Sequence, residues 1–146
     1  MRISNEVLQE LIDCYDDNSM EHSYYFNVKT NEIIFLSEYL DSGEEYEELN
    51  EEVEEGFGET YFRVPQTDSR QGFIDMEEFV ETVKSDDVQA ELYKALSGHR
   101  GVFRRFKDTL MDYPEIQQQY YQYKEERNKE RVIEWLNEDF PGVVIE

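Results

Sequence analysis

Two apolar runs decide the fold class of this 146-residue chain: SYYFN at residues 23–27 and EIIFL at residues 32–36, separated by the polar link KTN at residues 29–31. Aromatic and β-branched residues dominate both runs, and two such runs joined by a short polar link predict a β-hairpin. Because the apolar residues in each run are nearly continuous, we expect at least one strand to be covered on both faces.

Helical patterns flank this hairpin. Ser4 is placed to cap a first helix, in which apolar residues recur at three-and-four spacing over residues 7–15. The run TYFRV at residues 60–64 predicts a third strand, and from residue 68 onward the spacing is mainly helical. The tail at residues 143–145 is a candidate for a further edge strand. The sequence therefore predicts an α+β fold: a small antiparallel sheet of the hairpin plus one or two further strands, followed by a largely helical C-terminal half.

Length and composition favour one compact unit. The chain has 36 acidic and 14 basic residues, a formal net charge of -22, and 14% aromatic residues. That aromatic content argues against a disordered acidic polymer, so we expect a single acidic domain over residues 1–146. Cys14 is the only cysteine, no signal-like segment opens the chain, and no apolar run approaches the roughly 20 residues that cross a bilayer. We therefore expect a cytoplasmic protein without a membrane partner.

The strongest charge asymmetry lies in the acidic segment, residues 38–59, which holds eleven acids and no base. Tyr46, Leu49 and Val53 keep helical spacing within it, which predicts a short acidic helix. Repulsion between like charges three and four residues apart favours a mobile loop instead, and the sequence does not decide between the two. The candidate residues of an acidic surface are Glu44, Glu45, Glu47, Glu48, Glu51, Glu52, Glu54 and Glu55.

Motifs that would assign a reaction are missing. The two histidines, His22 and His99, are not part of a zinc-binding, zincin or carboxylate di-metal pattern, and Gly56-Phe57-Gly58 does not continue into a phosphate-binding loop. We therefore predict no catalytic residue, no metal site and no cofactor. Enzymatic activity is not favoured, and a hydrolase that uses paired carboxylates is the weakest of the alternatives.

The one constellation with a defined shape is the stretch GHRGVFRRFKD at residues 98–108. Its glycines permit a sharp turn into a helix, and its bases are candidates for binding an anion or a partner: Arg100, Arg104, Arg105 and Lys107. An internal role is the alternative. In that case the arginines neutralise the acidic half of the chain and pack their stems over aromatic rings.

This stretch also carries a family resemblance. Together with Ile133-Glu134-Trp135-Leu136, the Tyr24-Tyr25 hairpin and the strand from Tyr61 to Pro65, it resembles an uncharacterised bacterial protein family of the UPF class. The resemblance runs from the first helix to residue 138. It implies a small, acidic, cytoplasmic protein without an assigned activity, and so it brings no catalytic residues.

Three functional hypotheses remain. The leading one is a non-enzymatic interaction protein that binds a basic macromolecular partner, with nucleic-acid mimicry as its sharper form. The negative field disfavours direct contact with nucleic acid or an anionic membrane. The second is a protein that binds an anion or a small phosphorylated ligand through residues 100–107, and the third is the hydrolase. The sequence does not predict an oligomeric state.

Overall fold

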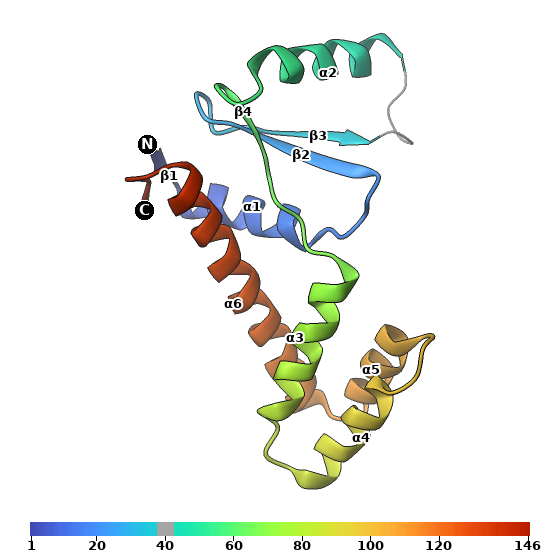
Figure 1. Ribbon diagram of the computed structural model, residues 1–146. Helices are drawn as coiled ribbons and strands as arrows, with labels where there is room; N and C mark the ends of the chain where they lie inside the picture. Colours follow the sequence, from blue (N-terminus) through green and yellow to red (C-terminus); the bar gives the residue numbers. More distant parts are fainter. Residues whose placement is uncertain (38–42) are drawn as a thin grey trace. The chain divides into compact units, whose positions relative to one another are not determined.

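The computed structural model describes residues 1–37 and 43–146 and confirms the α+β fold (Figure 1). The elements follow one another as β1 (Arg2–Ile3), α1 (Asn5–Asp16), β2 (His22–Asn27), β3 (Ile33–Ser37), α2 (Glu44–Gly56), β4 (Tyr61–Arg63), α3 (Ser69–Glu81), α4 (Asp86–Leu96), α5 (Val102–Met111), α6 (Pro114–Asp139) and β5 (Val144–Ile145).

The contacts of the chain group into two compact units. The first unit comprises residues 1–67 and 128–146, and the second comprises residues 68–127. Helix α6 therefore begins in the second unit and ends in the first. The expectation of one domain over residues 1–146 stays a prediction.

In the first unit, the predicted hairpin is the centre of a three-stranded antiparallel sheet with the order β3-β2-β4. Tyr24 lies opposite Phe35, and Phe26 lies between Ile33 of β3 and Phe62 of β4. The predicted third strand is confirmed as β4. The predicted tail strand forms as well, but β5 pairs in parallel with β1 and not with the main sheet.

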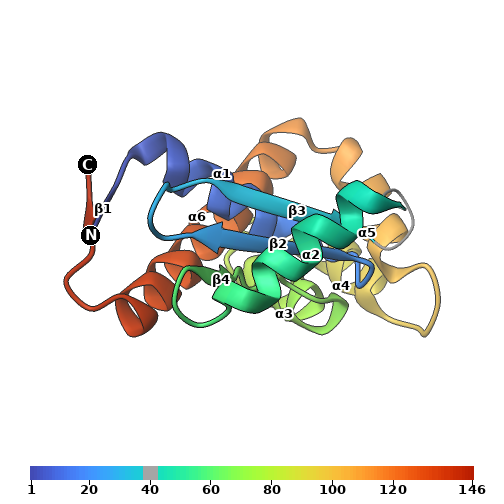
Figure 2. The same cartoon turned by 90° about the horizontal axis from the view of Figure 1, so that it is seen from above.

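Both faces of this sheet are covered, as expected. One face packs on α1 and the second half of α6, through a core that includes Leu11, Phe26 and Leu136. On the opposite face, α2 packs through Val53 against Leu36 and the ring of Tyr61. Figures 1 and 2 show α2 lying across β2 and β3 on the face opposite α1.

The second unit consists of helices. The hydroxyl of Ser85 caps α4 by accepting a hydrogen bond from the amide of Val88, at 3.4 Å. Phe79 of α3 and Phe106 of α5 both contact the ring of Tyr120 in α6, with ring centroids 5.3 and 5.2 Å apart. Aromatic packing therefore joins three of these helices, as edge-to-face ring pairs do in protein cores.

Candidate functional site

The acidic segment forms a helix from Glu44 to Gly56, so the helical alternative is confirmed for these residues. Residues 38–42, its beginning, lie outside the part that the structure describes. Val53 is buried against the sheet, with Tyr46 and Leu49 packed beside it. All eight predicted glutamates are exposed, and we call them the acidic face: Glu44, Glu45, Glu47, Glu48, Glu51, Glu52, Glu54 and Glu55.

The charge of the acidic face is not neutralised by the rest of the described chain. Within residues 1–37 and 43–146, none of the eight glutamates takes part in an ion pair. Glu52 accepts a hydrogen bond from the hydroxyl of Tyr61, at 2.5 Å, and this neutral donor leaves its charge in place. Within the described part of the chain, the basic side chains therefore form no ion pairs with these carboxylates.

The density of charge along α2 approaches that of a nucleic acid. At 1.5 Å per residue, a 13-residue helix is about 20 Å long. Eight carboxylates over that length give one negative charge per about 2.4 Å of axis, compared with about 1.7 Å for duplex DNA. A cationic surface would therefore face a comparable linear density of negative charge on α2 and on duplex DNA.

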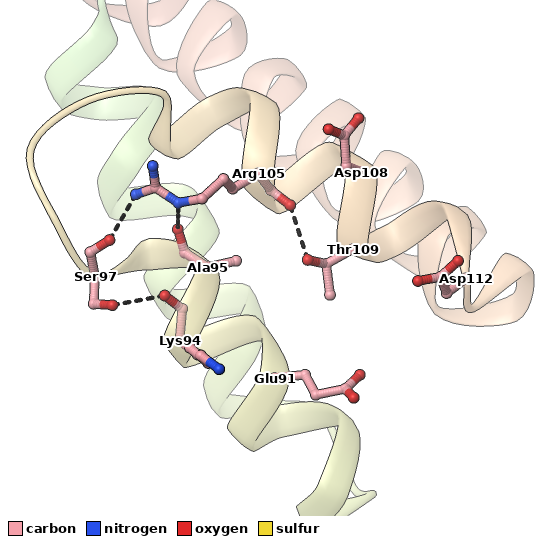
Figure 3. Close-up of a pocket in the computed structure, with 8 residues that line it drawn as sticks. All are labelled: Glu91, Lys94, Ala95, Ser97, Arg105, Asp108, Thr109 and Asp112. Carbon is pink, nitrogen blue, oxygen red and sulfur yellow. Dashed lines mark hydrogen bonds between the residues drawn. The ribbon is translucent and has the colours of Figure 1, made fainter.

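The second predicted site, at residues 98–108, contains a turn held by Arg105. Its Nε donates to the carbonyl of Ala95 at 3.3 Å, and its Nη2 donates to the carbonyl of Ser97 at 2.6 Å. Its Nη1 donates to the carbonyl of Arg100. Figure 3 shows the guanidinium reaching from α5 to the end of α4. The last carbonyls of a helix lack partners within it and favour a cation, so Arg105 completes the C-terminus of α4.

The two glycines of the motif make this arrangement possible. Gly98 has φ 101° and Gly101 has φ 69°, both in the left-handed region that favours glycine. A Cβ at Gly98 would lie 3.2 Å from Nη2 of Arg105, and one at Gly101 would lie 3.5 Å from Nη1. Gly98 and Gly101 therefore form a turn that packs around the guanidinium of Arg105.

The other three bases of the motif, Arg100, Arg104 and Lys107, are exposed to solvent. The side chain of Arg104 is 89% exposed, and its Nε lies 3.9 Å from Oδ2 of Asp108. Arg105 is directed to backbone carbonyls, so the structure does not bring the four bases together around one ligand. The expected neutralisation of the acidic half by Arg105 is not seen, because its acceptors are carbonyl oxygens and not carboxylates.

A groove of about 590 Å³ runs beside this turn, between α4 and α5 (Figure 3). Lys94 and Arg105 contribute positive charge to it, while Glu91, Asp108 and Asp112 contribute negative charge. Such a mixed lining does not select an anion. Binding of an anion by the remaining bases stays a prediction.

Sequence reasoning missed one polar cluster in the first unit. Nδ1 of His22 and the hydroxyl of Tyr24 each lie 2.6 Å from Oδ2 of Asp17. Burial alone would raise the pKa of Asp17, but hydrogen bonds from Tyr24, the Ser19 amide and His22 outweigh it and hold the pKa below its usual value. Burial and then the bond to Asp17 raise the pKa of Tyr24. No spacing motif marks this cluster, because it depends on the loop before β2, which brings Asp17 back to His22 and Tyr24 of that strand.

Ser37 lies opposite His22 in the register of β2 and β3, which places serine, histidine and aspartate near one another. Its exposed fraction is 1%, and among the described residues its hydroxyl has no hydrogen-bond partner. A buried hydroxyl is not open to a substrate. The cluster therefore contributes to the packing of the hairpin and lends no support to the hydrolase hypothesis.

The described residues lack two features that would indicate a metal site or a membrane span. They contain no group of three or more histidine, cysteine, aspartate or glutamate side chains suited to a metal ion, and no helix among them is long and apolar enough to cross a membrane. Cys14 is buried, and its burial, together with the charges of Asp13, Glu10 and Asp17, raises its pKa to about 12. The thiol is therefore protonated and unreactive near neutral pH.

The comparisons with known proteins identify a family. The model of the uncharacterised protein family UPF0158 matches residues 4–146. A UPF0158 protein of Pseudomonas aeruginosa is 38% identical over 64 residues, which are 44% of this chain and 41% of that relative. The matched part thus spans less than half of the relative's length, and no solved structure matches the chain. The chain belongs to the uncharacterised protein family UPF0158.

Proposed function

We propose that this protein binds a basic macromolecular partner through the acidic face of α2. The observation that carries the proposal is the combination of eight exposed glutamates with no ion pair among the described residues. Burial of Val53 and packing of Tyr46 and Leu49 fix the helix on the sheet, so the charges have defined positions. A fixed array of charge gives an oppositely charged partner both a fast encounter and a preferred orientation.

The sharper form of the proposal is mimicry of nucleic acid. A charge every about 2.4 Å along α2 is close enough to that of duplex DNA for a surface that neutralises phosphates to neutralise these glutamates as well. The partner is then a nucleic-acid-binding protein, and the acidic face occupies the surface that nucleic acid would otherwise contact.

Affinity capture across a salt gradient tests the proposal. The test variant changes Glu48, Glu51, Glu54 and Glu55 to glutamine, which removes four charges from the acidic face and keeps Glu52 on Tyr61. The control variant makes the same change at four exposed glutamates outside α2, namely Glu77, Glu81, Glu134 and Glu138. Both variants have the same net charge.

We expect the wild type and the control to retain basic proteins at low ionic strength and to release them as sodium chloride is added. The test variant should release the same proteins at lower salt. Equal retention by the test and control variants would show that only net charge matters and would overturn the proposal. Mimicry further requires that duplex DNA displaces the captured protein, and a captured protein that DNA leaves in place would contradict it.

A further inference from the structure

Helix α5 has a solvent-exposed side on which apolar and basic residues lie together. Its opposite side is buried through Phe106 and Leu110, which belong to the core of the second unit. Since each residue turns an α-helix by about 100°, four exposed residues of α5 fall within one arc of about 100° on the side away from this core. We call them the basic–apolar face: Phe103, Arg104, Lys107 and Met111.

The apolar members of this face are exposed and yet held in place. Met111 is 66% exposed and Phe103 is 38% exposed. A Cβ added at Gly72 of α3 would lie 3.3 Å from Cε1 of Phe103, so one side of the ring is seated on this glycine while the other is open to solvent. Methionine, aromatic residues and arginine are enriched in the cores of protein interfaces. Grouped on one helix face among polar residues, such side chains are typical of a surface that binds another protein.

The charge of the basic–apolar face is positive, in a chain whose net charge is -22. Among the described residues, Lys107 takes part in no ion pair. Arg104 is paired with Asp108 at 3.9 Å, and an exposed pair of this kind contributes little and is readily exchanged for another partner. Asp108 and Asp112 line the groove toward α4. The four members of the face therefore carry two positive charges and no carboxylate.

We infer that the basic–apolar face binds an acidic amphipathic helix of a partner protein. The apolar side chains of that helix pack against Phe103 and Met111, and its carboxylates pair with Arg104 and Lys107. Phe103, Lys107 and Met111 follow one another at a spacing of four residues, which forms a ridge that fits the groove of a second helix. This interface is opposite in sign to the acidic face of α2 and does not depend on the proposed function.

Two other occupants fit the face less well. The acidic helix α2 of a second copy packs its apolar residues Tyr46, Leu49 and Val53 against its own sheet, so it has none to place on Phe103 and Met111. Nucleic acid would pair its phosphates with the bases but would leave the two apolar side chains without a counterpart. The negative charge of the whole chain also repels a long polyanion more strongly than a short acidic segment.

NMR titration of the full chain with a synthetic peptide, at physiological ionic strength, tests the inference. The probe is a peptide with leucine at every third and fourth position and glutamate elsewhere. In the control peptide, glutamine replaces each leucine, so that the charge is the same and the apolar side chains are lost. We expect the probe to shift the amides of residues 102–111, and we expect the control peptide to bind at least about fivefold more weakly.

A pair of double variants tests the role of the two bases. Arg104→Gln with Lys107→Gln removes two charges from the face, and Arg70→Gln with Lys84→Gln removes one arginine and one lysine that are exposed elsewhere in the second unit. Both double variants have the same net charge. We expect the first to bind the probe about five- to tenfold more weakly than the second.

A pair of methionine variants tests the apolar contact. Met111→Gln keeps the length of the side chain and makes it polar, and Met20→Gln makes the same change at a residue that is 96% exposed in the first unit. We expect Met111→Gln to weaken binding of the probe about threefold, and Met20→Gln to leave it unchanged. Because both methionines are exposed, both variants should fold, which circular dichroism would verify.

Equal binding of the two peptides would mean attraction by charge alone and would overturn the inference. Binding of neither peptide, equal affinities within either pair of variants, or shifts outside residues 102–111 would overturn it as well. A DNA duplex that binds these residues more tightly than the probe would assign the face to nucleic acid instead. None of these outcomes decides the proposed function of the acidic face, which the capture experiment tests separately.

Discussion

Replacement of Arg105 by methionine tests the role that the structure gives to the 98–108 motif. The change keeps most of the side-chain stem and removes three donations, to the carbonyls of Ala95, Ser97 and Arg100. A hydrogen bond contributes about 0.5–1.5 kcal/mol net, and because Arg105 is exposed we take the lower half of this range for each. The expected loss in the free energy of unfolding is about 2 kcal/mol.

For a chain of this size, a loss of about 2 kcal/mol lowers the Tm by about 6 °C. Circular dichroism melting and urea titration provide the measurement, with Arg104→Met as the matched control. Within the described part of the chain, Arg104 forms only an exposed pair with Asp108, so its replacement should change the free energy of unfolding by less than about 0.5 kcal/mol. If the two variants melt at the same temperature, Arg105 does not hold the turn and the motif needs another explanation.

Four further results are expected. Gly98→Ala should cost about 1–2 kcal/mol in a urea titration, because φ is 101° and the new Cβ would lie 3.2 Å from Arg105; an unchanged midpoint would contradict the described turn. Moderate sodium chloride should raise the Tm, because it screens the repulsion of a net charge of -22; a Tm that falls steadily with salt would contradict this. The raised pKa of Cys14 contributes stability below pH 9, and this contribution should be lost as the pH rises toward about 12. Rapid reaction of the folded protein with a thiol reagent at neutral pH would contradict the burial of Cys14. The lowered pKa of Asp17 contributes stability above about pH 3.8, and this contribution is lost as the pH falls further. Asp17→Asn should therefore make the free energy of unfolding less dependent on pH in acid. An unchanged dependence would contradict the Asp17–Tyr24 hydrogen bond.

The periodic elements of this fold follow from the sequence, since local patterns determine them. Two runs of aromatic and β-branched residues joined by a short polar link predict the hairpin, and the spacing of apolar residues predicts the helices. The sequence does not decide the conformation of the acidic segment, because two effects oppose one another there. Like-charge pairs cost a few tenths of a kcal/mol each, whereas burying a side chain such as Val53 contributes about 1.5–3 kcal/mol. The structure shows that burial on the sheet prevails.

The structural role of Arg105 cannot be predicted from the sequence, for a different reason. The spacing of Gly98, Gly101 and the arginines indicates a turn with a basic helix start, but a free guanidinium and a bound one have the same sequence. The structure brings α5 close to the end of α4, and there the carbonyl oxygens of Ala95 and Ser97 accept hydrogen bonds from the Arg105 guanidinium. Likewise, the contact of His22 with Asp17 depends on a loop conformation that no periodic pattern encodes.

The most direct test of the central claim is a map of backbone amide shifts during titration with a lysine-rich peptide at low ionic strength. The account predicts that the largest shifts fall on residues 44–56, and that they are markedly smaller in the Glu48, Glu51, Glu54 and Glu55 to glutamine variant than in the wild type. Shifts spread evenly over all exposed carboxylates, or concentrated in residues 68–127, would contradict it.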